Sequence, residues 1–269
     1  MSQPDLPEER RLWAKGAGKR RKLSSSELRQ RLFDTALDML SDTGLTVSLA
    51  HLNMEELIRL ADVPRSSVYR EWETKEAFYL DLMERMIEPE RSLGVAFDQQ
   101  TLDIAAAVIQ QYQDRLDTPD GRRSVLRETI RQGVERNFYA VSKSLSWRTF
   151  IALVATLPAL PPDARERLLE ALRTAEAHFI DRMVEFYSAM IVTLGLRVKP
   201  EFNLHLFATT VSSLVEGMIA RQLTNPGIVS NPVMLPGIDD EPVEWHLSAA
   251  AFLGVVDLMV EPDPKWQPL

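Results

Sequence analysis

The chain has 269 residues, 45 % of them hydrophobic, and a formal net charge of −8. This length can bury one large core or two smaller ones. Because the sequence contains no cysteine, disulfides, thiolate metal sites and cysteine nucleophiles are excluded, and a reducing compartment is favoured. The first residues lack the apolar segment of a signal peptide, and the longest apolar run, residues 149–160, is too short to span a bilayer. We therefore expect a soluble, cytoplasmic protein.

The N-terminal segment is strongly basic, although the whole chain is acidic. Seven basic residues and no acid lie between positions 10 and 22: Arg10, Arg11, Lys15, Lys19, Arg20, Arg21 and Lys22. Because Gly16 and Gly18 favour flexibility, residues 1–23 are expected to form a flexible basic arm. Such an arm is either a solvated tail or a segment that contacts phosphates or a minor groove.

Helical periodicity recurs along the rest of the chain, and strand patterns are nearly absent. Ser24 and Glu27 form a capping-box pattern, which predicts a helix that ends near Gly44. The apolar face of this helix is expected to comprise Phe33, Ala36, Leu37 and Leu40. These patterns predict an all-α fold.

Two short helices joined by a tight turn are predicted next. Asn53 and Glu56 form a second capping pattern, and Asp62 tolerates the left-handed backbone of a turn. Pro64 suits the first position of a helix, where its missing N–H costs nothing, so a helix is expected from Pro64 to Trp72.

The second of these helices has a small, polar and cationic outward face. If Val68 faces the core, steps of about 100° per residue point the following side chains outward: Ser66 and Arg70 most directly, Ser67 and Tyr69 beside them, and Arg65 at the border. Such a face is typical of a helix that enters a major groove, where serine forms hydrogen bonds and arginine reads guanine or contacts phosphate. A surface helix that only joins two others is the alternative.

The stretch MEELIRLADVPRSSVYREWETKEAFYLDLM, residues 54–83, resembles the DNA-binding domain of the tetracycline-repressor (TetR) family. In that family the helix-turn-helix ends in a tyrosine, with an aromatic residue three positions later and a Lys-Glu pair that opens the fourth helix. Tyr69, Trp72, Lys75 and Glu76 match this pattern. The stretch LFDTALDMLSDTG, residues 32–44, resembles the first helix of the family, so the resemblance covers residues 25–90.

The sequence departs from the family pattern in three places. The link at residues 45–53 is longer than usual, Asp62 stands where the family favours glycine, and Pro64 stands where it favours serine or threonine. Both residues suit their positions locally.

The resemblance implies a helix-turn-helix domain at residues 24–90 and a helical effector-binding and dimerisation domain at residues 91–269. It implies that Tyr69 and Lys75 contact phosphates and that Thr74 caps the fourth helix, whose free amides form an anion site. The candidates for base contacts are Arg65, Ser66, Ser67 and Arg70. In this setting the arm, including Arg20, Arg21 and Lys22, is expected to contact DNA.

Further helices are predicted at residues 99–116, 122–143, 146–157, 163–195, 201–222 and 244–260. In the TetR family such helices enclose an effector cavity. The candidate lining residues are Phe138, Trp147, Phe150, Phe179, Met183, Tyr187 and Met190. Because few charges lie among them, an apolar or aromatic small molecule is expected; a packed core is the alternative.

The last two predicted helices resemble the dimerisation elements of the family. The apolar face of residues 201–222 comprises Leu204, Phe207, Ala208, Val211, Val215 and Met218, and that of the final helix comprises Leu247, Ala250, Ala251, Gly254 and Leu258. Between them, residues 223–245 are rich in proline and glycine and have no periodic pattern, so this segment is expected to be functional or mobile.

The sequence also permits other classes of protein. No common catalytic or phosphate-binding motif occurs, and no catalytic residue, cofactor or metal is expected. The residues Asp239, Asp240, Glu241, Glu244 and His246 could bind a metal, but acids before a helix are typical of dipole compensation.

The sequence thus predicts a homodimeric transcriptional regulator, a repressor released from a palindromic DNA operator by a small ligand. The alternatives are a helical ligand- or protein-interaction module without specific DNA binding, and an enzyme.

Overall fold

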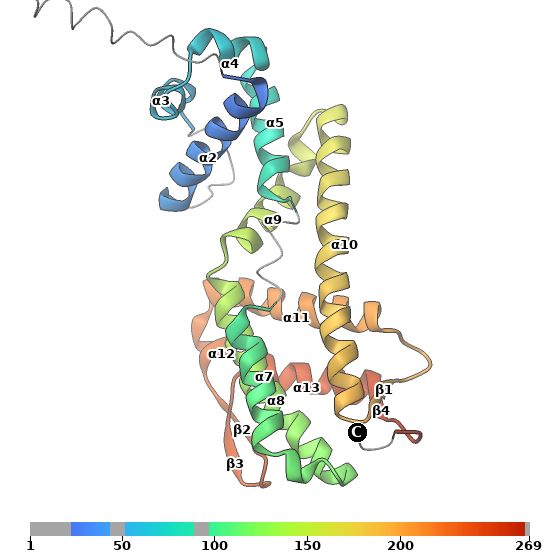
Figure 1. Ribbon diagram of the computed structural model, residues 1–269. Helices are drawn as coiled ribbons and strands as arrows, with labels where there is room; N and C mark the ends of the chain where they lie inside the picture. Colours follow the sequence, from blue (N-terminus) through green and yellow to red (C-terminus); the bar gives the residue numbers. More distant parts are fainter. Residues whose placement is uncertain (1–22, 44–51, 89–96, 267–269) are drawn as a thin grey trace, which may run out of the picture. The chain divides into compact units, whose positions relative to one another are not determined.

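Helices dominate the computed structural model, which describes residues 23–43, 52–88 and 97–266 (Figure 1). Within these residues the strands form two short antiparallel pairs, β1 with β4 and β2 with β3. The predicted all-α class is therefore confirmed. None of the helices in the described ranges is both long and apolar enough to cross a membrane.

The described residues divide into two compact units, residues 23–42 with 52–78 and residues 79–88 with 97–266. The division falls inside a single helix, α5 (Lys75–Met86). The domain border predicted at residue 90 and the basic arm with Arg20, Arg21 and Lys22 lie outside the described residues.

The first unit contains α2 (Ser25–Thr43), α3 (Met54–Leu60), α4 (Arg65–Glu71) and the first turn of α5. The capping box before α2 is confirmed, because Ser24 N donates to Glu27 Oε2 at 2.9 Å and Glu27 N donates to Ser24 Oγ at 3.1 Å. Asn53 Oδ1 caps α3 by accepting from two backbone N–H groups of its first turn. Side-chain caps therefore fix where these helices begin.

The turn between α3 and α4 has the predicted left-handed residue, since Asp62 adopts a φ of 49°. The start of α4 differs from the prediction by one residue. Pro64 has extended backbone angles, with φ −68° and ψ 124°, and α4 begins at Arg65. Pro64 thus precedes the helix rather than forming its first residue.

Three aromatic rings form the core of the first unit. The ring centroids of Phe33 and Trp72 are 5.8 Å apart, and those of Trp72 and Phe78 are 5.1 Å apart. All three side chains are buried. Because α2, α4 and α5 each contribute one ring, this cluster fixes the orientation of α4 within the unit.

The second unit is built from longer helices, namely α7 (Gln99–Gln111), α8 (Pro119–Ser142), α9 (Leu145–Thr156), α10 (Pro162–Thr193), α11 (Leu204–Thr224), α12 (Pro226–Ser230) and α13 (Leu247–Met259). Two 3₁₀ turns, η3 (Gln113–Arg115) and η4 (Leu157–Ala159), follow α7 and α9. The strands are β1 (Leu196–Val198), β2 (Val233–Pro236), β3 (Pro242–Trp245) and β4 (Val260–Pro262). Figure 1 shows α7 alongside α8, and α11, α8 and α10 pack around the main core with α13.

The proline-rich segment after α11 has a defined structure that the sequence pattern did not predict. It forms α12 and then a β2–β3 hairpin, whose turn contains Asp240 at a φ of 62°. Since residues 242–245 belong to β3, the last helix begins at Leu247 rather than at residue 244.

Arginines of the neighbouring segments hold the turn of this hairpin. Arg115 pairs with Asp239 at 2.6 Å, and Arg127 pairs with Asp240 at 2.6 Å and donates to the carbonyl oxygen of Gly237. These two acids are therefore engaged in ion pairs. Within the described residues no group of three or more histidines and acids is arranged to hold a metal.

The apolar face predicted for dimerisation on α11 packs within the subunit instead. Phe207, Ala208, Val211 and Val215 are buried in the main core of the second unit. On α13, by contrast, Gly254 and Leu258 of the predicted face are exposed. Leu206 and Leu223 of α11, outside the predicted face, are exposed as well, and Gly217 and Gly254 have open space where a Cβ would lie.

Candidate nucleic-acid interface and candidate ligand cavity

The outward face of α4 has the composition predicted from the sequence. Val68 is buried and points inward, whereas Arg65, Ser66, Tyr69 and Arg70 are exposed and Ser67 is partly exposed. Trp72 ends the helix and is buried in the aromatic cluster. One side of α4 therefore packs into the core, and the other presents small polar and cationic groups to solvent.

The only acid of α4 is directed toward α2. Glu71 accepts a hydrogen bond from Ser25 Oγ at 2.7 Å and pairs with Arg29 at 3.2 Å. The Arg29 guanidinium also lies 5.1 Å from the centroid of the Trp72 ring. Because Glu71 is neutralised by α2, the arginines dominate the charge on the outward face of α4.

A glutamate on α3 contacts two of the predicted DNA-binding residues. Glu55 Oε1 lies 2.8 Å from an Arg65 nitrogen and accepts a hydrogen bond from the Tyr69 hydroxyl at 3.2 Å. The Arg65 guanidinium lies 5.4 Å from the Tyr69 ring centroid. Glu55 thus orients both side chains across the turn. This role could not be predicted from the sequence, because a contact between residues ten and fourteen positions apart has no helical spacing.

The remaining cations of this face have no such restraint. Within the described residues, Arg70 and Lys75 form no ion pair, and both side chains are exposed. Thr74 Oγ1 accepts a hydrogen bond from Ala77 N at 3.1 Å, so the predicted cap of α5 is confirmed. Both cations can therefore pair with an anion near this helix N-terminus, where exposed acids also flank Lys75.

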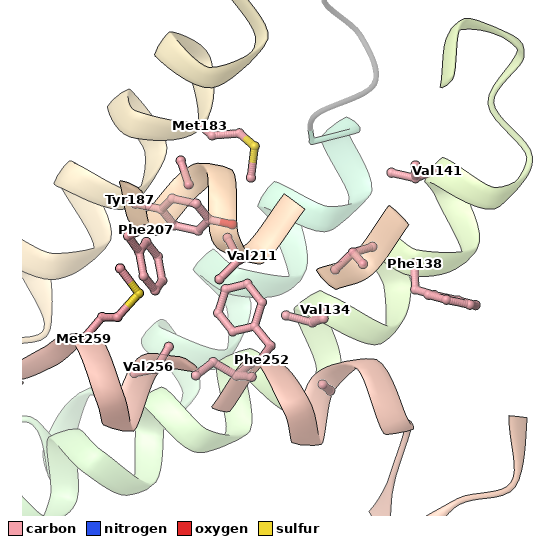
Figure 2. Close-up of a cluster of buried hydrophobic side chains, with 14 of the residues drawn as sticks. Val134, Phe138, Val141, Met183, Tyr187, Phe207, Val211, Phe252, Val256 and Met259 are labelled. Atoms are coloured by element: carbon pink, nitrogen blue, oxygen red, sulfur yellow. The ribbon is translucent and has the colours of Figure 1, made fainter. Parts of the chain in front are cut away.

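The second unit contains a partly open cavity of about 110 Å³. Its wall is formed by residues of α7, α8, α10, α11 and α13. Four of the predicted lining residues form part of it, namely Phe179, Met183, Tyr187 and Met190. Figure 2 shows Met183 and Tyr187 of α10 facing Val211 of α11, and Phe252 of α13 nearby. A cavity of this size holds several waters or a small organic molecule.

The other three predicted lining residues do not line this cavity. Phe138 is fully buried and packs against His246, with 4.4 Å between ring centroids, and in Figure 2 its side chain extends away from Met183 and Tyr187. Trp147 packs against the outside of the main core, and Phe150 belongs to a separate cluster around Leu168. The helical spacing of apolar residues predicts that a side chain is buried, but it does not predict whether that side chain lines a cavity or packs in the core.

The wall of the cavity is apolar apart from a few groups. The hydroxyls of Thr101, Thr129 and Ser212 donate to Asp98 Oδ1, Val125 O and Thr209 O respectively. Burial raises the pKa of Tyr187, whose hydroxyl oxygen is directed toward Val211 in Figure 2.

Glu216 of α11 is the acid on this wall. Burial raises the pKa of its carboxyl to about 7, and the negative charge of Glu176 contributes to the shift. Glu216 could not be identified from the sequence, because a single acid among the apolar residues of a helix is typical of the border between its buried and exposed faces.

No family model and no curated protein matches the sequence. Among solved structures, the chain is similar to E. coli NemR in its reduced form, with 15 % identity, 88 % of this chain and 98 % of that chain covered, and a TM-score of 0.44. It is similar to a protein from Rhodococcus sp. described as a TetR-family transcriptional regulator, with 14 % identity, coverage of 87 % and 98 %, and a TM-score of 0.42.

A third similar structure is a protein from Saccharomonospora viridis described as a transcriptional regulator and solved in complex with choline. It is 14 % identical, with 88 % of this chain and 99 % of that chain covered and a TM-score of 0.44.

Proposed function

We propose that this protein is a sequence-specific DNA-binding transcriptional regulator in which α4 is the recognition helix. The observation that carries the proposal is the outward face of α4, where Arg70 is exposed and unpaired beside Ser66 while Val68 and Trp72 fix the helix to the core. A short, rigidly anchored helix with small polar and arginine side chains suits the major groove of DNA.

Each residue of this face has a proposed role. Arg65, Ser66, Ser67 and Arg70 contact base edges, whereas Tyr69, Lys75 and the backbone N–H groups after Thr74 contact phosphates. The basic arm, with Arg20, Arg21 and Lys22, adds contacts to phosphates or the adjacent minor groove. The residues on α4 thus provide sequence preference, and the others provide affinity.

The regulator is proposed to act as a homodimer and as a repressor. The exposed Leu206, Leu223 and Leu258 and the open space around Gly217 and Gly254 support contact between copies through α11 and α13. A two-fold dimer binds a palindromic operator. A ligand in the cavity of the second unit favours a conformation in which the two recognition helices no longer match the half-site spacing, which releases the operator.

A genome-wide pull-down with the purified protein tests the proposal. Fragmented double-stranded DNA from the source genome is captured at physiological salt, with excess random-sequence duplex as competitor. The proposal expects strong enrichment of a few fragments that share an inverted repeat. Uniform recovery of all fragments, or none, would overturn it and favour a helical module without specific DNA binding.

A further inference from the structure

Glu216 differs from the other polar groups on the wall of the cavity. The hydroxyls of Thr101, Thr129 and Ser212 already donate within the chain, and Asn137 also has a partner. Within the described residues, by contrast, Glu216 forms no hydrogen bond and no ion pair. A partly buried carboxylate that lacks a partner is less favourable than one in water, so a ligand that supplies a partner gains binding energy from it.

The charges near Glu216 do not supply that partner. Of the titratable groups in the described residues, Glu176 is the one whose charge contributes to the pKa of Glu216, and it is another acid. The part of the cavity wall beside Glu216 therefore has a negative potential when these carboxyls are ionised. An anionic ligand is disfavoured there, and a cation is favoured.

Aromatic rings form much of the remaining wall. Phe97, Phe186, Tyr187, Phe207 and Phe252 all line the cavity. They contact one another in a chain, with centroid distances of 4.4 Å for Phe97–Phe186, 5.0 Å for Tyr187–Phe207 and 5.9 Å for Phe207–Phe252. The faces of aromatic rings attract organic cations, and their surfaces bind apolar groups.

We infer that the cavity binds a small organic cation with an apolar body, an amine or a quaternary ammonium compound, and that Glu216 is its counter-charge. This inference rests on the proposed function, since it names the chemical class of the effector. It refines the apolar or aromatic small molecule expected from the sequence, because the apolar body is kept and a positive charge is added.

Binding measurements on the protein without DNA test this inference. The probes are benzyltrimethylammonium and neopentylbenzene, which have the same shape and differ in charge. Isothermal titration calorimetry is performed on the wild-type protein, on Glu216→Gln, and on Glu201→Gln as a control that removes an exposed carboxylate outside the cavity wall. We expect the wild type and Glu201→Gln to bind the cation about tenfold or more tightly than the neutral compound. Glu216→Gln is expected to lose this preference but to keep its affinity for the neutral compound.

Three results would overturn the inference. They are equal or tighter binding of the neutral compound by the wild type, an unchanged preference in Glu216→Gln, and the absence of binding of either probe at millimolar concentration. Because no DNA is present, the result is independent of the proposed role of α4. Cation binding by a protein that fails to select DNA would refute the regulator and leave the cavity assignment standing.

Discussion

The two units of this protein differ in the charged groups that they offer to a binding partner. In the first unit the acid of α4 is neutralised by α2, and Arg70 and Lys75 face solvent without an ion pair in the described residues. In the second unit many exposed acids pair with arginines, as Asp239 does with Arg115, whereas Glu216 has no partner in the described residues and faces an apolar cavity. An outward cation suits a large polyanion, and an inward anion suits a small cation.

The two units also differ in how their cores are packed. In the first unit three aromatic rings pack in one small core that also holds aliphatic side chains such as Leu32 and Leu57, so its recognition face depends on few contacts. In the second unit the core is continuous from α8 through α10, α11 and α13 but encloses a cavity. We therefore expect single substitutions to affect the first unit as a whole, whereas substitutions at the cavity wall change ligand binding more selectively.

The largest effect is expected for Trp72→Ala. Removing this buried ring from its contacts with Phe33 and Phe78 should destabilise the first unit by about 3–5 kcal/mol and abolish DNA binding. Hydrogen exchange resolved along the sequence should show loss of protection in α2 to α4 but not in α10 or α11. Tyr69→Ala, which removes an exposed ring from the same helix, is the control and should leave protection intact. Equal loss of protection in both units would show that they are not separate.

Arg70→Ala should reduce discrimination between bases at one position of each half-site by about 1–3 kcal/mol. Lys75→Ala should instead weaken binding to all sequences to a similar extent, because a phosphate contact has no sequence preference. Competition binding with a set of single-base variants of the selected operator distinguishes the two. If both substitutions caused the same sequence-independent loss, Arg70 would not read a base.

The stability of the second unit should depend on pH through Glu216. The pKa of its carboxyl is about 7 in the folded protein against 4.5 for an ordinary glutamate, so the folded state binds the proton more tightly than the unfolded chain. The free energy of unfolding should therefore fall as the pH rises from about 4.5 through about 7. Between pH 5 and pH 8 the wild type should lose about 1–3 kcal/mol relative to Glu216→Gln. Urea unfolding at each pH measures the difference, and parallel curves for the two proteins would contradict it.

The smallest effect is expected for Glu55→Gln, because the contact of Glu55 with Arg65 is largely exposed. Losing a negative charge beside the DNA-binding face should raise the affinity for random duplex about two- to fivefold, while the base preference near Arg65 weakens. Glu56→Gln, which removes the adjacent acid, is the control and should change affinity without changing preference. Fluorescence anisotropy with operator and random duplexes measures both. Identical behaviour of the two variants would show that Glu55 does not orient Arg65.

Local signals explain what could be predicted from the sequence. Caps at Ser24, Asn53 and Thr74 and the left-handed Asp62 depend on neighbouring residues, so they were predicted correctly. Long-range partners could not be predicted in this way. The hairpin turn depends on arginines more than a hundred residues away, and the contact of Glu55 with Tyr69 depends on the angle between two helices.

The cavity illustrates the same limit. Phe179, Met183 and Tyr187 of α10 were predicted to line an effector cavity, and these residues line the cavity of the second unit. Helical periodicity gives the buried face of one helix but not the space left between five helices. For that reason Phe138 and Trp147 could not be separated from the lining residues, and Glu216 could not be recognised.

Footprinting on a selected fragment tests the central claim most directly. Protection by the wild-type protein should cover two symmetric half-sites whose centres are about one helical turn apart or somewhat more. It should disappear in the Arg70→Ala/Lys75→Ala double variant, whose fold is checked by circular dichroism. A single asymmetric protected segment, or a footprint that the double variant leaves unchanged, would contradict the assignment of α4 as a recognition helix in a dimeric regulator.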